Sequence, residues 1–287
     1  MSQSRPRAAR LHAALSATFE GLHSTVGGAS FERRTGHVRL LLPSVPLAIF
    51  NGVLVESEPC SGVGESIGEV EERGLPCGVQ LREGQHPEVE AEARAMGLTE
   101  RTPMPGMTVS FEELVEAFHD GLEISRVEDE AGLLDAATVA ASAFGAPPAV
   151  LQALYSPEVA QIDGMSVYLG HVDAGAVTTA MGYRTGREGA IFSVATPAEH
   201  RRHGYGAAIT AFATRSLFES GADLAWLQTT PIGERVYFRL GFRQVANHIL
   251  RNPLHLCSPR ICFRSGNDCE GRQYALKQVF RKLSIKE

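Results

Sequence analysis

One stretch of the sequence decides the fold, Val194-Ala195-Thr196-Pro197-Ala198-Glu199-His200-Arg201-Arg202-His203-Gly204-Tyr205-Gly206-Ala207-Ala208-Ile209. It joins an apolar strand predicted over 190–194 to a helix predicted over 204–220. Gly204 and Gly206 lack side chains, so the backbone can curl tightly and leave N–H groups free for a ligand. The helix dipole and the basic residues at 201–203 add positive charge. The stretch therefore predicts an anion site that suits a pyrophosphate.

Other interpretations of the two glycines fit less well. A turn followed by a solvated basic loop would explain a bare Gly-x-Gly, but not the strand, the helix and the adjacent arginines together. A Walker loop needs Gly-Lys-Ser/Thr, which is absent here. A dinucleotide-binding fingerprint needs a third glycine where this sequence has Ile209.

The elements on either side of this stretch follow a definite order from residue 122 onward. Hydrophobic periodicity and turn residues predict a strand, two helices, three strands, and then helix, strand, helix and strand. The strands are predicted at 122–127, 165–171, 176–184, 190–194, 224–228 and 242–250, and the helices at 129–144, 148–155, 204–220 and 233–240. The last long helix ends at Gly221, a residue that favours helix C-termini.

This pattern resembles a known family. Val-x-x-Pro followed by Arg-x-x-Gly-x-Gly and an apolar helix is similar to the cofactor motif of the GNAT superfamily of N-acetyltransferases. A second family-like stretch follows, Ala225-Trp226-Leu227-Gln228-Thr229-Thr230 and then Gly233-Glu234-Arg235-Val236-Tyr237-Phe238-Arg239-Leu240-Gly241-Phe242. Two motifs in the expected order are more specific than one, and the resemblance covers Leu122 to Asn252.

The resemblance implies a mixed α/β, acyl-CoA N-acyltransferase fold with a central, mostly antiparallel twisted sheet, splayed strands and flanking helices. It also implies acetyl-CoA as the acyl donor and a primary amine as the acceptor, which attacks directly in a ternary complex. The strands ending at Val194 and Gln228 would splay apart to admit the pantetheine arm. The expected cofactor contacts are Val194, Ala195 and Thr196 for pantetheine, and Arg201, Arg202, His203, Gly204, Tyr205, Gly206 and Ala207 for the pyrophosphate.

The resemblance also implies two catalytic features. A bulge in the first splayed strand would leave an N–H group able to stabilise the oxyanion. Tyr237 lies four residues before Gly241, where family members often carry the tyrosine that protonates the departing thiolate. An aromatic residue beside Val236 and Leu240 could instead serve packing. The general base stays open, since Glu199, His200, Gln228 and Asp163 are candidates by sequence proximity alone.

The N-terminal third alternates strands and helices. It is interpreted as a degenerate copy of the same fold, in tandem with the first, or as an unrelated α/β cap. In the copy, 50–55 would match the cofactor strand, Gly62-Val63-Gly64 the turn and 77–81 the splayed strand. Aligning Gly97 with Gly241 places Ala93 where Tyr237 stands, and Pro59-Cys60-Ser61 replaces the arginine motif. We therefore expect residues 1–118 to have a structural or substrate-covering role, and 119–252 to form the acetyltransferase domain.

Composition bounds the remaining questions. The 287 residues are 44% hydrophobic and 21% charged, which is typical of a globular protein. The net charge of −6 argues against a nucleic-acid partner, and no apolar run is long enough to span a membrane. The composition therefore predicts a cytoplasmic protein without nucleic-acid or membrane partners. Residues 253–287 form a basic extension, expected to be poorly ordered. A zinc site could be drawn from His255, Cys257, Cys262 and Cys269, but their spacing matches no familiar finger, and no metal is expected.

The leading hypothesis is an acetyl-CoA-dependent N-acetyltransferase with Tyr237 as the catalytic acid. Two alternatives stay open: a catalytically inactive acyl-CoA-binding or structural protein of the same fold, and a module that binds another phosphate ligand such as a nucleotide.

Overall fold

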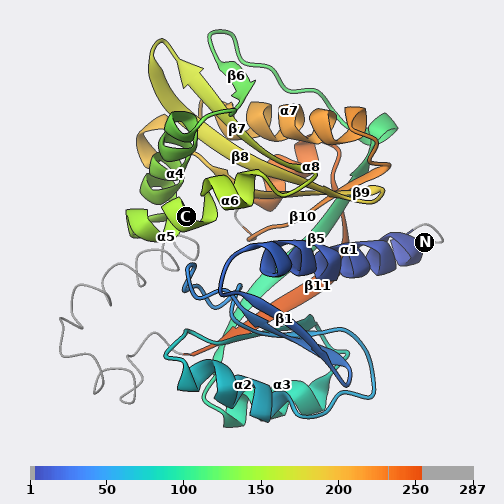
Figure 1. Ribbon diagram of the computed structural model, residues 1–287. Coiled ribbons are helices and arrows are strands. Elements are labelled where there is room, and N and C mark those ends of the chain that lie inside the picture. Colours follow the sequence, from blue (N-terminus) through green and yellow to red (C-terminus); the bar gives the residue numbers. More distant parts are fainter. Residues whose placement is uncertain (1–3, 232, 254–287) are drawn as a thin grey trace.

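The computed structural model describes residues 4–231 and 233–253, in which a single mixed sheet of eleven strands runs through the molecule (Figure 1). The strand order is β1-β2-β3-β4-β11-β5-β10-β9-β8-β7-β6. The strands are β1 (Ser30–Arg34), β2 (His37–Leu41), β3 (Gly52–Val55), β4 (Gly78–Arg82), β5 (Glu100–Ser110), β6 (Glu123–Arg126), β7 (Met165–Val172), β8 (Gly175–Thr185), β9 (Glu188–Ala195), β10 (Leu224–Gln228) and β11 (Arg243–Asn252). The helices are α1 (Ser4–Thr25), α2 (Val63–Glu72), α3 (Pro87–Ala95), α4 (Glu130–Phe144), α5 (Pro148–Leu154), α6 (Pro157–Ala160), α7 (Tyr205–Glu219) and α8 (Glu234–Arg239).

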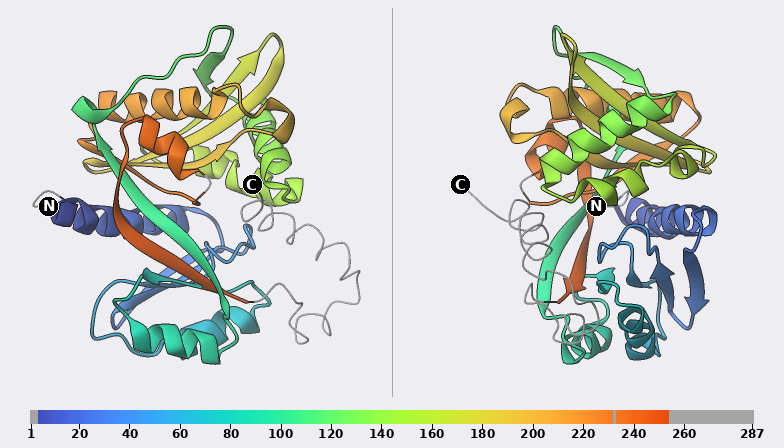
Figure 2. Two further views of the ribbon diagram at one scale, coloured as in Figure 1. Left: turned by 180° about the vertical axis from the view of Figure 1, so that it is seen from behind. Right: turned by 60° about the vertical axis from the view of Figure 1, so that its left-hand side comes forward.

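The two long strands β5 and β11 join the two halves of the sheet. Each lies next to a strand of the other half, because β5 pairs with β10 and β11 pairs with β4. The two strands also pair with each other, antiparallel, from Arg243↔Thr108 to Asn252↔Glu100. Figure 2 shows them as a long twisted ribbon that runs between the halves. Each half of the sheet is thus completed by a strand from the other half.

The two halves repeat one order of elements. The series β3-α2-β4-α3-β5 corresponds to β9-α7-β10-α8-β11, and β3/β4 and β9/β10 are the parallel pairs of an otherwise antiparallel sheet. The ends of α3 and α8 match in detail. The Leu98 N–H donates to the Ala93 carbonyl and the Phe242 N–H to the Tyr237 carbonyl, across Gly97 (φ 91°) and Gly241 (φ 94°). The predicted alignment of Ala93 with Tyr237 therefore holds in the backbone.

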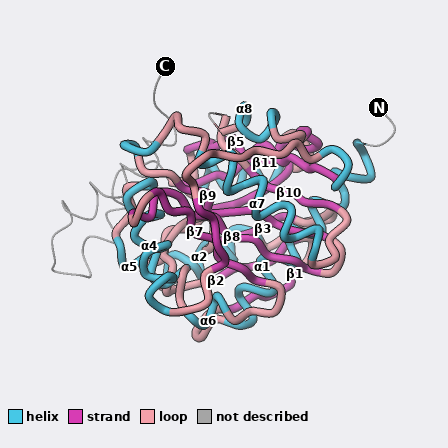
Figure 3. The backbone as a smooth tube through the Cα atoms, turned by 90° about the horizontal axis from the view of Figure 1, so that it is seen from above, coloured by secondary structure: helices cyan, strands magenta, loops and turns pink. Residues whose placement is uncertain are grey.

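Helices cover both faces of the sheet. In the C-terminal half α7 packs on one face and α4 on the other, and in the N-terminal half α2 and α3 pack on the face that includes Val53, Val79 and Leu81. Helix α1 lies across the middle of the opposite face, between the two halves (Figure 1). Seen from above, α4 and α5 lie at one side of the strands (Figure 3). No described helix combines the length and apolar character needed to span a bilayer.

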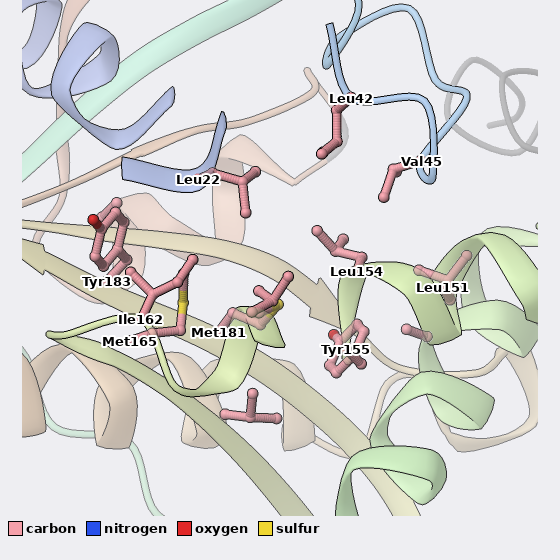
Figure 4. Close-up of a cluster of buried hydrophobic side chains, with 14 of the residues drawn as sticks. Leu22, Leu42, Val45, Leu151, Leu154, Tyr155, Ile162, Met165, Met181 and Tyr183 are labelled. Carbon is pink, nitrogen blue, oxygen red and sulfur yellow. The ribbon is translucent and has the colours of Figure 1, made fainter. Parts of the chain in front are cut away.

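One hydrophobic core spans both halves. Leu22 of α1 and Leu42 and Val45 of the loop after β2 belong to the same buried cluster as Leu154 and Met181 of the C-terminal half (Figure 4). The cluster lies between the sheet and the helices α1 and α4–α6, which cover the same face of the sheet. Because burial of apolar area is the main stabilising contribution, the two halves stabilise each other.

The predicted fold class is confirmed: the sheet is mixed, mostly antiparallel and flanked by helices. The sequence patterns did not reveal β1, α6 or the full length of β5. Pro103 and Pro105 obscured its first half. They are accommodated because β10 pairs only from Gly106 to Ser110, so this part of β5 has a single partner strand. His255 and the three cysteines after it lie outside the described residues.

Candidate functional site

Strands β9 and β10 separate part-way along their length. They pair in parallel from Glu188↔Leu224 to Ala190↔Trp226, and no further pairing follows although β9 continues to Ala195 and β10 to Gln228. Among the described residues, the facing backbone edges of the two diverging ends have no partner strand. An extended ligand arm can therefore pair with β9 here in the manner of an added strand.

A bulge interrupts β9 at the same level. The register with β8 shifts between Thr179 and Met181, and Ser193 has a φ of 52°, which is unusual for a residue other than glycine. Tyr155, fully buried after α5, donates its hydroxyl to the Ser193 Oγ at 2.9 Å. This hydrogen bond fixes the position of Ser193 in the bulge. A rigid bulge can aim a backbone N–H into the gap between the strands.

The loop after β9 forms a cradle of backbone N–H groups. Arg202 (φ 69°) and Gly204 (φ 87°) are both left-handed, and α7 starts directly after Gly204. In the described residues the N–H groups from Arg202 to Gly206 donate to no acceptor, whereas that of Ala207 already bonds within the helix. Free N–H groups at the N-terminus of a long helix form an anion site.

The two arginines of this loop have different surroundings. The Arg201 guanidinium donates to the Thr196 carbonyl and to the Ala143 carbonyl at the end of α4, both at 3.0 Å. The Arg202 side chain is exposed and has no hydrogen bond or ion pair with any described residue. Arg201 therefore shapes the loop, while Arg202 is available to a ligand.

Tyr237 lies on α8, beside the same gap. It packs edge-on against Phe242, with ring centroids 6.1 Å apart, and both Val194 and Tyr237 border one hydrophobic cluster beneath α7. Burial raises the pKa of the Tyr237 hydroxyl to about 12. The group therefore keeps its proton at neutral pH and is available as a donor.

Comparison with known proteins agrees with this geometry. No protein-family model and no curated protein matches the chain. Solved structures do match: a GCN5-related N-acetyltransferase from Kribbella flavida has a TM-score of 0.64 at 22% identity, over 84% of this chain and 95% of its own. One from Sphaerobacter thermophilus has a TM-score of 0.56 at 16% identity, over 84% and 90%. A tandem GNAT protein from the clavulanic acid biosynthesis pathway has 0.56 at 12% identity, over 83% and 87%.

The chain has the GNAT fold. The fold that the two motifs predicted by resemblance is confirmed. The likeness extends over most of the described residues rather than the C-terminal half alone.

A residue that the sequence patterns did not reveal borders the cradle of this GNAT fold. His119, in the segment between β5 and β6, packs on Tyr205 with ring centroids 4.7 Å apart, and His203 stacks on the same ring at 5.4 Å. The His119 Nδ1 is buried and has no partner in the described residues. No motif surrounds His119, so only the fold brings it to the N-terminus of α7.

The equivalent place in the N-terminal half is closed. Gly62 (φ 77°) precedes α2 as Gly204 precedes α7, but the Gly64 N–H already donates to the Glu92 carboxylate at 2.9 Å. The loop before it carries Glu56 and Glu58 in place of basic residues. A phosphate would meet negative charge here, so this GNAT-like half lacks an anion site of the same kind.

The candidates for a general base are dispersed. Glu199 and His200 lie in the short helix Ala198–His200, before the cradle. Asp163 lines a groove with Arg126 and Arg184 on the far side of β8, and so lies away from the diverging strands. Gln228 ends β10 at the gap itself, but an amide has no basic nitrogen.

Proposed function

We propose that the protein is an acetyl-CoA-dependent N-acetyltransferase that transfers an acetyl group to a primary amine by direct attack in a ternary complex. The observation that carries this proposal is the coincidence of the β9/β10 divergence with a cradle of free N–H groups at the start of α7. A thioester arm fits the first feature and a pyrophosphate fits the second.

In this proposal the residues have distinct roles. The pyrophosphate binds the N–H groups of residues 202–206 and the Arg202 side chain, while Arg201 holds the loop through the Thr196 and Ala143 carbonyls. The backbone of Val194 to Thr196 pairs with the pantetheine arm. His119 and His203, stacked on Tyr205, border the phosphates.

The transfer itself forms one bond and breaks one. The neutral amine nitrogen attacks the thioester carbonyl carbon, and the N–H group at the Ser193 bulge stabilises the negative charge that develops on oxygen. The C–S bond then breaks. Tyr237 donates its hydroxyl proton to the leaving sulfur, the proton lost by the amine passes to solvent, and the Tyr237 oxygen regains a proton from solvent. The mechanism needs no covalent enzyme intermediate.

Calorimetric titration with acetyl-CoA tests the proposal. Gly206→Glu places a carboxylate in the cradle with no backbone strain, since the nearest atom to a new Cβ, the Thr196 Oγ1, is 3.5 Å away. Gly68→Glu on α2, where a Cβ meets nothing within 4 Å, is the matched control. We expect binding to the parent and to the control, and loss of binding in Gly206→Glu. Absence of binding to the parent would overturn the proposal, and binding without turnover of any amine would favour a binding protein.

A further inference from the structure

The four central strands carry polar side chains on the face that α1 covers. Alternation along each strand sends Val79 and Leu81 toward α2 and α3, and so turns Gln80 and Arg82 of β4 toward α1. The same alternation turns His248 of β11 toward α1. The polar residues on this face are Gln80, Arg82, Thr108, Trp226, Gln228 and His248, and they come from both halves of the chain.

All of these side chains hold a buried nitrogen or oxygen that has no hydrogen-bond partner in the described residues. The atoms are Gln80 Oε1, Arg82 Nε, Thr108 Oγ1, Trp226 Nε1, Gln228 Nε2 and both ring nitrogens of His248, and the facing His12 of α1 adds its Nδ1. His248 is 1% exposed and Gln80 3% exposed. Buried polar atoms are nearly always paired with a protein group, an ordered water or a ligand, so this concentration of polar atoms can hold a bound polar group. We call Gln80, Arg82, Gln228, His248 and His12 the junction cluster.

Arg82 supplies a positive charge to the junction cluster. Arg82 and His248 are direct cross-strand partners on β4 and β11, so their side chains lie next to each other. Arg82 has no ion pair with any described carboxylate. The Glu56 carboxylate, which acts on His12, is itself engaged by Arg33 and Ser16. Burial and the Arg82 charge lower the pKa of both His12 and His248, which keeps the two stacked rings neutral.

The junction cluster offers donors and acceptors together. The free atoms of Arg82 and Gln228 donate, and Gln80 Oε1 accepts. His12 donates its Nε2–H to the Glu56 carbonyl at 3.1 Å, so its free Nδ1 is an acceptor. A guanidinium suits a carboxylate, and uncharged acceptors suit an amine or ammonium group. The combination matches a zwitterion.

The junction cluster adjoins the diverging strands. Gln80 of β4 donates to Gln228 at 2.8 Å, and Gln228 is the last residue of β10 at the gap. Trp226, two residues earlier, ends the parallel pairing with β9 and faces α1 as well. An amine held by the junction cluster therefore lies on the side of the sheet opposite α7, next to the place proposed for the thioester.

We propose that the junction cluster is the acceptor site and that it selects a small amine that bears a carboxylate, as in an amino acid, with the carboxylate on Arg82. This inference rests on the proposed function for its catalytic consequence. Burial beneath α1 excludes a folded protein as acceptor, because His248 and Gln80 are out of reach of a large surface.

Paired acceptors test the inference. CoA release from acetyl-CoA is measured with the standard amino acids, each beside the amine that lacks its α-carboxylate, for the parent, Arg82→Gln, Arg82→Lys and the control Arg101→Gln on β5. We expect the parent and control to prefer the carboxylated acceptor. Arg82→Gln should lower that preference about 10- to 100-fold, as expected for the loss of a charged hydrogen bond, and Arg82→Lys should lower it less. The Kd of acetyl-CoA should not change in any variant, which checks that each variant folds.

Equal turnover of both members of each pair by the parent, or an unchanged preference in Arg82→Gln, would overturn the inference and leave the junction cluster as a hydrated interior. Acetylation of peptides but not of amino acids would overturn it too. Calorimetry with amino acids alone separates the two proposals. Amino-acid binding that Arg82→Gln abolishes, in a protein that does not bind acetyl-CoA, would support the junction cluster and overturn the acetyltransferase.

Discussion

The backbone N–H of Gly64 donates to the Glu92 carboxylate at 2.9 Å, so a side chain of α3 occupies the N-terminus of α2. At the equivalent N-terminus of α7, the N–H groups from Arg202 to Gly206 have no acceptor in the described residues. The N-terminal half thus fills the N-terminus of its helix with its own carboxylate, whereas the C-terminal half leaves the equivalent N–H groups free for a ligand.

This difference predicts one acetyl-CoA per chain. Calorimetry should give a stoichiometry of one for the parent and for Glu92→Ala, because Glu56 and Glu58 still oppose a phosphate at α2. Loss of the Gly64 hydrogen bond should lower the free energy of unfolding by about 1 kcal/mol. A second binding event in either protein would contradict the assignment of the closed half.

The two arginines of the cradle should respond differently to alanine substitution. Arg202→Ala removes a free charge, so it should weaken acetyl-CoA binding about 5- to 10-fold at low salt and less at high salt, with little change in stability. Arg201→Ala removes two hydrogen bonds to carbonyls, so it should lower the free energy of unfolding by about 1–2 kcal/mol and weaken binding at every salt concentration. Identical salt dependence in the two variants would contradict these separate roles.

Tyr237→Phe tests the general acid. The phenyl ring retains the contact with Phe242, so the Kd of acetyl-CoA should stay within about 2-fold of the parent, while kcat falls about 100-fold or more. Tyr168→Phe, which removes the hydroxyl of a buried tyrosine on β7, is the matched control and should leave kcat unchanged. Full activity of Tyr237→Phe would show that the ring serves packing alone.

The sequence predicted well what is encoded locally. Periodicity and glycines located α7, β10 and the cradle, because each depends on residues close together in the chain. The exchange of β5 and β11 was not predictable, since the alternation of apolar residues in β11 fits any neighbouring strand equally. The junction cluster escaped detection for the same reason. Arg82 and His248 are 166 positions apart and become partners only through the exchange.

The buried His248 predicts a dependence of stability on pH. Burial, with Arg82 and His12 nearby, lowers its pKa to about 3 in the folded protein, against about 6.5 in the unfolded chain. As the pH falls below 6.5 the unfolded chain binds a proton that the folded protein does not, so stability decreases with falling pH. Between pH 7 and pH 5 this histidine should account for a loss of about 2 kcal/mol in the free energy of unfolding.

The variant His248→Asn tests this prediction. Over the same pH interval its free energy of unfolding, measured by urea titration without an amine, should fall by about 2 kcal/mol less than that of the parent. His12, His23 and His37, whose pKa values are also lowered, contribute in both proteins, so only the difference between the slopes reports on His248. Parallel slopes would mean that His248 already shares a proton with a partner in the folded protein, and the junction cluster would then carry more positive charge than Arg82 alone supplies.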